Sequence, residues 1–391
     1  MTDNEDKKLG KKFFVRLFIV ILLVVIAACS FTFGINYLIN GEKGYQEVTV
    51  STNSPNSASE MKFIYNFGQT DLSVPAEKRA VTKLYSDLSL YYYHLFDVYK
   101  TYSGLNNIAS INNSPNVELT VPSDLYNSLK IAVKDEHRNI YLGPIYEVYN
   151  VLFSCESDID ASNWDPLKSS EIRSYFDSIL EFAKSDNYIH LEFKDDNVII
   201  LHVNEEYIAL AKEIGVSHFI DFYYLKNAFI VDFIADKMIE SGYTHGSISS
   251  LDGYVRNFDD TGNEYSYDYF NTTDHGIEAV GKLTYTNFSS ICTLHPFVLT
   301  DLEASEFIYQ YKNGEYVTRY ISIEDGLSHD SSCAVVVFSE KLKCTDLMYA
   351  VLPYYQNDNP TSFEMDNCGI IFSDGNDIKA IIPDTFTFKE S

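Results

Sequence analysis

Positive charge is scarce in this sequence. Its 391 residues include 29 lysines and arginines against 56 aspartates and glutamates, which gives a formal net charge of −27 at pH 7. Five of the basic residues lie within the first 16 positions, so the rest of the chain has 24 basic residues against 53 acidic ones. A surface with this charge repels phosphate groups, which proteins contact through lysine and arginine. We therefore expect no nucleic acid among the partners.

Cysteine is also sparse, and its spacing excludes the usual metal motifs. The six cysteines are far apart, without a CxxC pair or a combination with histidine that would hold zinc. The spacing does not indicate a disulfide framework, and it leaves one long-range bridge open. We expect most of the thiols to be buried and unpaired. They are Cys29, Cys155, Cys292, Cys333, Cys344 and Cys368.

The short motifs of the common hydrolases and nucleotide-binding enzymes are missing. The nine histidines are isolated, with no HExxH or HxH pair, and the chain has no GxSxG, GxxxxGK[ST] or GxGxxG motif. This argues against metalloproteases, serine hydrolases, P-loop proteins and Rossmann dehydrogenases. Two acidic pairs, Asp158 with Asp160 and Asp259 with Asp260, offer oxygen ligands, but neither has the ligand number of a Ca²⁺ loop. We interpret both pairs as solvated loop carboxylates.

Apolar and aromatic residues, in contrast, are abundant. Apolar residues make up 46% of the chain, and 31 tyrosines and 26 phenylalanines stand against a single tryptophan. This is enough to build one large domain or two closely packed ones. Tyrosine packs its ring while its hydroxyl forms hydrogen bonds, so we interpret the tyrosines as packing residues.

The amino-terminal segment has the features of a membrane anchor. From Phe13 to Ile39 the sequence is almost uninterruptedly apolar, and a run of this length spans a bilayer as a helix. Its only charge is Arg16, and the basic residues before it place residues 1–12 in the cytoplasm and the bulk of the chain outside. The expected location is the cell surface or the periplasm.

Two kinds of anchor fit this segment. One is an uncleaved signal anchor, and the other is a lipoprotein signal, because Ile26-Ala27-Ala28 places small residues before Cys29. Apolar residues continue beyond Cys29, whereas a lipidated tether is usually polar, which favours the uncleaved helix.

The remainder divides into a polar tether and one domain. Residues 40–60 are rich in Ser, Asn and Gly and are expected to be the tether, and residues 61–391 form the domain. Long helical patterns alternate with hairpins, which predicts an α+β fold with a largely antiparallel sheet. Helices are expected at 76–102, 122–134, 144–153, 169–185, 226–240 and 343–352, and strands at 61–68, 188–193, 198–203, 278–286, 289–297, 307–311, 316–323, 333–339, 368–373 and 378–383.

Several short motifs follow one another in an order typical of a known family. Asn107-Ile108 and Ile111-Asn112 come after the early strand and long helix, residues 139–150 read NIYLGPIYEVYN, and a later segment reads DFYYLKNAFIVD. From Met61 to Phe388 this order resembles the FAD:protein FMN transferases, also called thiamine-biosynthesis lipoproteins. The resemblance implies a single large domain, related to the T-fold, with a mostly antiparallel sheet.

The central block of that family is matched only in part. It reads Asp, Leu, Gly, two or three apolar residues, Lys-Gly-Tyr, two residues and Asp, and it is similar to DFYYLKNAFIVD here. Asp221 and Asp232 match both aspartates, but Asn227 stands in the lysine position and Tyr223 where an earlier glycine belongs. Lys226 lies one place early, which on a helix turns its side chain away by about 100°.

Three further family motifs are also incomplete. The Ile-Ser-x-Gly-Gly-Asn turn is similar to residues 248–253, where both glycines are replaced and Gly253 lies nearby. The His-Ile-Ile-Asp-Pro-x-Thr-Gly segment is similar to residues 319–326, which keep the apolar centre and Gly326 but lack the histidine and the aspartate. The metal-binding Ala-Asp-Ala-Leu-Ser-Thr helix start is similar to TDLMYA, which keeps Asp346 and lacks the last threonine.

The resemblance implies a flavin site and a metal site. It assigns Asp346 to a divalent metal ion, Mg²⁺, although the helix dipole alone also explains an acidic residue in a first helical turn. It implies FAD as the cofactor and an exported protein as the acceptor of FMN, and it assigns no catalytic residue. The cofactor-binding residues that it implies are Asp221, Lys226, Asn227, Ser249, Ser250, Gly253 and Gly326.

Three functions remain open. In the family's reaction a threonine hydroxyl of the acceptor attacks the FAD phosphorus nearest riboflavin and displaces AMP, while a metal ion and a lysine neutralise the pyrophosphate. Losing one such contact commonly costs about 3 to 4 kcal/mol of barrier, and several are altered here. We therefore favour a catalytically impaired protein that binds a flavin or a partner. An active, divergent FMN transferase and an unrelated cell-envelope interaction module are the alternatives.

Overall fold

The structure is a computed structural model that describes residues 41–50, 54–216, 218–286, 288–299, 307–329, 333–374 and 377–391. The expected membrane segment 13–39, including Cys29, and the expected turn residues Gly375 and Asn376 lie outside the described residues. Within the described ranges, no helix combines the length and the apolar character that crossing a bilayer requires.

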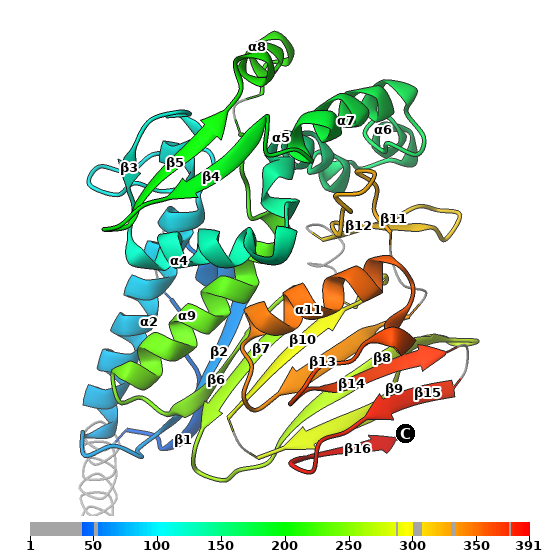
Figure 1. The fold of residues 1–391 in the computed structure, drawn as a ribbon. Helices are drawn as coiled ribbons and strands as arrows, with labels where there is room; N and C mark the ends of the chain where they lie inside the picture. Colours follow the sequence, from blue (N-terminus) through cyan, green and yellow to red (C-terminus); the bar gives the residue numbers. More distant parts are fainter. Residues whose placement is uncertain are drawn as a thin grey trace, which may run out of the picture.

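The centre of the molecule is an eight-stranded sheet with the order β1-β2-β6-β7-β10-β13-β14-β15 (Figure 1). Every neighbouring pair in it is antiparallel. β10 and β13 are buried along their whole length, because other layers cover both faces of the sheet there. The strands are β1 (Gly44–Glu47), β2 (Met61–Phe67), β6 (His245–Ser250), β7 (Tyr254–Asp259), β10 (Ser289–Leu294), β13 (Val335–Ser339), β14 (Gly369–Asp374) and β15 (Asp377–Ile381).

Helices cover one face of this sheet and a second sheet covers the other. On the helical face, α9 (Lys226–Glu240) packs on β6 and β7, α11 (Cys344–Gln356) packs on β10 and β13, and α2 (Val74–Phe96) lies beside α9. On the opposite face lies a three-stranded sheet, β16-β9-β8. Its strands are β8 (Tyr265–Thr273), β9 (Gly276–Tyr285) and β16 (Phe386–Glu390). The residues buried between the two sheets include Val255, Ile291, Val336, Ile371, Tyr269, Leu283 and Phe386.

The remaining elements form a second lobe above the helical layer, drawn in cyan to green in Figure 1 except for the hairpin β11-β12, which is gold. It contains a three-stranded antiparallel sheet, β3-β5-β4, and the small hairpin β11-β12. One continuous buried core extends through both lobes, so they form a single domain. The elements are α3 (Ile108–Asn112), β3 (Leu119–Thr120), α4 (Ser123–Ala132), α5 (Gly143–Tyr149), α6 (Asp158–Ser162), α7 (Ser170–Ala183), β4 (Ile189–Phe193), β5 (Val198–Val203), α8 (Glu205–Ile214), β11 (Ile308–Gln310) and β12 (Tyr316–Thr318).

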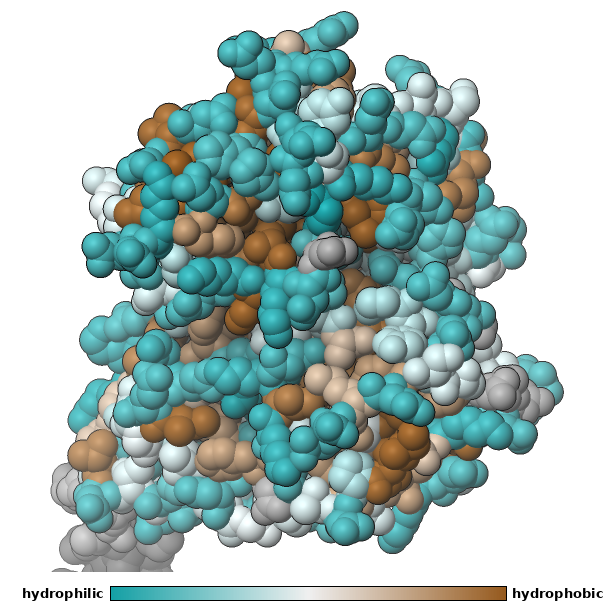
Figure 2. All heavy atoms as spheres, viewed as in Figure 1, coloured by the Kyte–Doolittle hydropathy of each residue, from teal (hydrophilic) through white to brown (hydrophobic). Residues whose placement is uncertain are grey.

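Short 3₁₀ turns connect several of these elements, and two of them border the site described below. The turns are η1 (Ser57–Glu60), η2 (Lys134–Glu136), η3 (Asn139–Leu142), η4 (Leu152–Ser154), η5 (Tyr223–Leu225) and η6 (Pro360–Ser362). Figure 2 shows that hydrophilic side chains cover most of the face seen in Figure 1, with apolar patches between them.

The α+β architecture and the antiparallel sheet expected from the sequence are confirmed. The helix expected at 226–240 has these bounds in the structure. The helix expected to reach residue 102 ends at Phe96, because Asp97 is extended and its carboxylate accepts hydrogen bonds from the backbone N–H groups of Tyr99 and Lys100. Further elements of the structure were not expected from the sequence, and β1, which pairs with β2, lies within the range expected as a tether. The further elements include α8, β6, β7, β8 and β16.

Candidate functional site

One cavity of about 210 Å³ lies where five segments of the chain meet. Glu60 directly precedes β2, and because β2 and β6 are antiparallel neighbours, it lies next to the turn that follows β6. There the N–H of Leu251 donates to the carbonyl of Glu60 at 2.9 Å. The cavity wall includes Glu60, Asp97, Tyr146, Asp221, Lys226 and Arg319. Pockets that enclose drug-sized ligands commonly measure about 300 to 1,000 Å³, so this cavity is small.

Glu60 is at the centre of the charged groups in this wall. Its carboxylate accepts from Lys226 Nζ at 3.1 Å and from Asn227 Nδ2 at 2.8 Å. Burial acts to raise the pKa of Glu60, but the charge of Lys226 and the hydrogen bond from Asn227 outweigh it and hold the pKa below its ordinary value. Lys226 therefore does line the cavity, and its charge is already balanced by Glu60.

Asn227 links Glu60 to a second buried carboxylate. Its Nδ2 also donates to Asp252 Oδ2 at 3.0 Å, and Asp252 lies in the turn between β6 and β7. Burial, with the nearby charge of Glu60, raises the pKa of Asp252 to about 6. Within the described part of the chain, Oδ1 of Asp252 and Oδ1 of Asn227 are buried without a hydrogen-bond partner.

Asp221 and Tyr223 form the wall next to the start of α9. Asp221 accepts from the N–H of Tyr223 at 2.8 Å, and burial raises the pKa of Asp221. Tyr223 has a φ of 46°, and it is the only residue of the described ranges with positive φ that is not Gly, Asn or Asp. A left-handed conformation costs a side chain of this kind about 1 to 2 kcal/mol. Its ring is stacked on Tyr146 at 4.6 Å between centroids, which offsets that cost.

Arg319 is the second cation of the cavity. Its guanidinium lies over the rings of Phe307 at 4.3 Å and Tyr223 at 5.1 Å. Among the described residues its side chain has no carboxylate within ion-pair distance, and its Nε is buried without a hydrogen-bond partner. The same residue stands where the resembling family has a histidine.

The structure brings some of the predicted cofactor-binding residues to this cavity and places others elsewhere. Asp221 and Lys226 line the cavity, and Asn227 is joined to it by its hydrogen bond to Glu60. Ser250 does not line the cavity, and its hydroxyl accepts from the N–H of Tyr254 at 3.2 Å. Ser249 is on the same strand as Ser250, and its side chain points to the other face of the sheet.

The two predicted glycines have conformational roles. Gly253 has a φ of 95°, and a Cβ there would lie 2.4 Å from the backbone oxygen of Thr293 on β10. Only glycine therefore permits this close turn. Gly326 has a φ of 70° and packs against Leu180 of α7, away from the cavity.

The predicted metal ligand, Asp346, lies at the start of α11. It is exposed, and its carboxylate accepts from the N–H of Lys343 at 3.0 Å, as an acidic residue in a first helical turn commonly does. In the described part of the chain it does not belong to a group of three or more Asp, Glu, His or Cys side chains close enough to share a metal ion.

Asp232, the other aspartate matched by the central block, stabilises the start of the same helix, α11. Its buried carboxylate accepts from the N–H groups of Cys344 and Thr345 at 3.0 and 2.9 Å, and it pairs with Arg256 at 2.9 Å. Of the two matched aspartates, Asp221 therefore lines the cavity and Asp232 caps α11.

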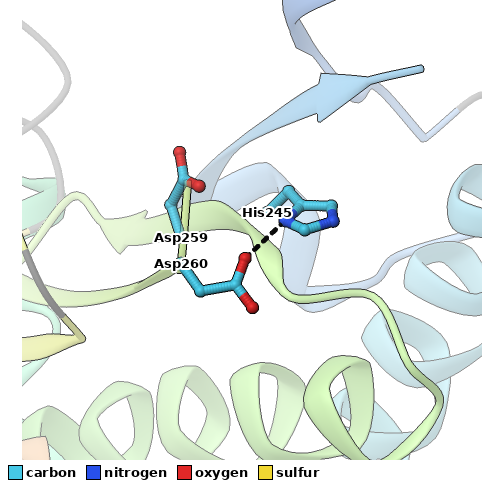
Figure 3. Close-up of side chains that lie close together, drawn as sticks. All are labelled: His245, Asp259 and Asp260. Atoms are coloured by element: carbon cyan, nitrogen blue, oxygen red, sulfur yellow. Dashed lines mark ion pairs between the residues drawn. The ribbon is translucent and has the colours of Figure 1, made fainter. Parts of the chain in front are cut away.

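A separate acidic cluster lies at the opposite end of β6 and β7 (Figure 3). His245 pairs with Asp260 at 2.7 Å, and ligand atoms of His245, Asp259 and Asp260 lie within 4.8 Å of one another. Asp259 is fully buried, so the expectation of a solvated carboxylate is wrong for it. Both of its oxygens already accept hydrogen bonds, from Tyr45, Tyr265 and Thr261, which explains how the charge is tolerated.

Sequence reasoning missed Glu60 and Asp252 as site residues. Glu60 directly precedes an expected strand, and Asp252 lies in the turn segment that resembles a family motif. The sequence around each residue shows its place beside a strand or in a turn, but it contains no local pattern that indicates burial. Only the pairing of β2 with β6 shows that they approach the start of α9.

Comparison with known proteins gives a result at the level of the fold. No family model matches the sequence, and no curated protein sequence matches it. Several solved structures are similar, among them the following three. The ApbE protein of Thermotoga maritima is 13% identical, with 84% of this chain and 94% of that chain covered and a TM-score of 0.52. The flavin transferase ApbE of Vibrio cholerae is 10% identical, with 90% of this chain and 98% of that chain covered and a TM-score of 0.53. The flavinyl transferase ApbE of Pseudomonas stutzeri, in its apo form, is 9% identical, with 87% of this chain and 94% of that chain covered and a TM-score of 0.50.

The chain therefore has an ApbE-like fold over most of its length, with a sequence that has diverged widely from these structures. The resemblance seen in the order of the sequence motifs is confirmed for the fold.

Proposed function

We propose that this protein is a flavin-transferase-like binding protein, held at the extracytoplasmic face of a membrane, that binds a flavin or an envelope partner without transferring FMN. The observation that carries the proposal is the pair formed by Lys226 and Glu60. A lysine can neutralise a pyrophosphate only if no other anion already balances its positive charge. Here the Glu60 carboxylate, 3.1 Å from Lys226 Nζ, already balances the charge of the lysine.

The charges around the cavity support the same conclusion. The wall holds the carboxylates of Glu60, Asp97 and Asp221 against two cations, Lys226 and Arg319. Two like charges about 4 Å apart repel by roughly 4 kcal/mol at the effective dielectric of a protein surface. A pyrophosphate would thus meet net repulsion where catalysis of FMN transfer needs attraction. The volume of about 210 Å³ is also small for a dinucleotide.

The metal requirement is poorly met as well. If a divalent ion bound as in the resembling family, it would use Asp346 and neutralise phosphate charge. Asp346 already accepts a hydrogen bond within its helix start, and Thr345 next to it donates its hydroxyl to Asp232 at 3.0 Å. These donors and acceptors hold the helix together and do not form a prepared cation site.

A second candidate, an active FAD:protein FMN transferase that depends on Mg²⁺ and modifies a threonine of exported redox proteins, is favoured by one observation. Lys226 reaches the cavity although it lies one place early in the motif. If Glu60 moved away, the ammonium group would face the cavity. The third alternative, an unrelated envelope interaction module, would be favoured by a different fold, and the fold is ApbE-like.

The anchor and location are part of the proposal. The apolar run from Phe13 to Ile39, with basic residues before it and acidic residues after it, supports an extracytoplasmic domain attached by a helix or by lipid on Cys29. Mass spectrometry of the mature amino terminus distinguishes the two anchors.

A flavinylation assay tests the proposal. The full chain in detergent is incubated with FAD, Mg²⁺ and an acceptor domain, and AMP release and covalent flavin are measured together with binding of FAD and FMN in equilibrium dialysis. Binding of a flavin without AMP release supports the proposal. Covalent transfer that is lost in Asp346→Ala supports the active transferase.

A further inference from the structure

We propose that Glu60 is an internal anion, whose carboxylate occupies a phosphate-type site formed by Lys226, Asn227 and Arg319. The inference uses the cavity of the proposed function but does not require that a flavin bind there. It accounts for the presence of two cations, Lys226 and Arg319, in a cavity whose wall also carries three carboxylates.

The geometry around Glu60 is that of a bound anion. Its two oxygens are held by different donors, Oε1 by Lys226 Nζ at 3.1 Å and Oε2 by Asn227 Nδ2 at 2.8 Å. The positive charge of Arg319 acts on the same carboxylate from further away. One ammonium, one amide and one guanidinium around a carboxylate are the groups with which proteins also bind phosphate.

The side chain is held where a ligand could replace it. The backbone of Glu60 is fixed by the hydrogen bond from Leu251, so only the side chain needs to turn. The Glu60 side chain is 20% exposed and that of Lys226 is 28% exposed, and both line the open cavity. A rotation of the Glu60 side chain would free two donors at once.

Glu60 accepts hydrogen bonds from Lys226 and Asn227 but not from Arg319. In the described ranges it has ring contacts with Tyr223 and Phe307 but no carboxylate partner, and its buried Nε has no acceptor. Lys226 and Asn227 are each engaged by Glu60. An anion with two phosphate groups could contact Arg319 as well as the two donors that Glu60 now occupies.

The remaining carboxylates decide the pH at which the site is most positive. Asp252 is hydrogen-bonded to Asn227, and Asp221 lines the same cavity. Burial raises the pKa of Asp221, and it raises the pKa of Asp252 to about 6, so Asp252 loses its negative charge as the pH falls through 6. Neutralising Glu60 then leaves Lys226 and Arg319 facing the two remaining carboxylates of the cavity wall, Asp97 and Asp221.

The test uses isothermal titration calorimetry to measure the affinity of the full chain, in detergent at pH 6, for inorganic pyrophosphate. In Glu60→Gln the charge is removed while the shape is kept, and we expect pyrophosphate to bind at least about tenfold more tightly than to the wild type, which corresponds to about 1.4 kcal/mol. Glu47→Gln removes the same charge from the exposed side of β1 and is expected to bind as the wild type does. Adding Lys226→Gln to Glu60→Gln is expected to abolish the gain.

Equal affinity of Glu60→Gln and the wild type would overturn the inference, and so would an equal gain in Glu47→Gln. Circular dichroism checks that each variant is folded. If Glu60→Gln does not fold, Glu60→Asp replaces it, since the shorter carboxylate cannot reach both donors and should give a smaller gain, and no gain there would also overturn the inference. Pyrophosphate binding is measured without FAD or acceptor, so its result is independent of whether FMN is transferred.

Discussion

Replacing Asp232 with alanine tests whether this matched aspartate is a structural residue. Its side chain is 4% exposed and accepts three hydrogen bonds, from two backbone N–H groups and the hydroxyl at the start of α11. It also pairs with Arg256, whose side chain is 11% exposed. In Asp232→Ala the first N–H groups of α11 lose their buried acceptor, and the Arg256 guanidinium keeps only its contact with Asp236 at 3.3 Å.

The expected loss of stability follows from these contacts. Removing one partner of a buried ion pair costs about 3 to 5 kcal/mol when the other charge is left uncompensated. Asp236 still pairs with Arg256 at 3.3 Å, so we expect a loss near the lower end of this range. Folded domains are commonly stable by only about 5 to 15 kcal/mol, so the variant loses a large part of its stability. Asp232→Asn keeps the shape and part of the hydrogen bonding, and we expect it to cost about half as much.

Urea denaturation of the full chain in detergent, followed by tryptophan and tyrosine fluorescence, measures these losses. A double-mutant cycle with Arg256→Met gives the coupling, which we expect to be at least about 2 kcal/mol, as for residues that share a buried network. If Asp232→Ala unfolds within 1 kcal/mol of the wild type, a threshold of roughly the scatter between such measurements, the structural role of Asp232 is refuted.

Three further changes have definite expected results. The pKa of Asp252 is raised to about 6, so the folded state keeps a proton that the unfolded chain releases above about pH 4, and the stability of the wild type falls between these two pH values. The free energy of unfolding of Asp252→Asn should therefore rise by roughly 3 kcal/mol relative to the wild type from pH 4 to pH 7. The exposed control Asp71→Asn should show no such gain. Gly253→Ala places a Cβ 2.4 Å from a backbone oxygen and should cost at least about 2 kcal/mol more in urea denaturation than Gly262→Ala, whose Cβ meets open space at a similar φ. Asp346→Ala should cost about 0.5 to 1 kcal/mol, equally with and without Mg²⁺ in thermal melts, and a loss seen only with Mg²⁺ would instead indicate a metal ligand.

The sequence predicts much of this fold because local patterns are strong. α9 has the expected bounds, since its apolar spacing is regular and a buried face holds it in place. The hairpin β4-β5 follows from two short apolar strands around a tight turn. In contrast, β1 is a four-residue strand in a polar segment, and contacts with distant parts of the chain stabilise it, namely its pairing with β2 and the hydrogen bond from Tyr45 to Asp259. Local propensity alone does not reveal such an element.

The site is harder to predict than the fold, because its chemistry depends on contacts between distant segments. Lys226 and Asn227 were recognised by their place in a motif, but their charge balance depends on Glu60, which is 166 positions away from Lys226 in the sequence. Tyr223 was recognised as standing in a glycine position of the resembling family, and its φ of 46° lies in the left-handed region that glycine adopts without strain.

The central claim is that the cavity cannot neutralise a pyrophosphate, so that the protein has the shape of a flavin transferase without its activity. The most direct test is the release of AMP from FAD by the full chain in the presence of Mg²⁺ and an acceptor domain, measured by chromatography. The account predicts no AMP above the level of a protein-free control. Multiple turnovers of AMP with stoichiometric flavin on the acceptor would contradict it.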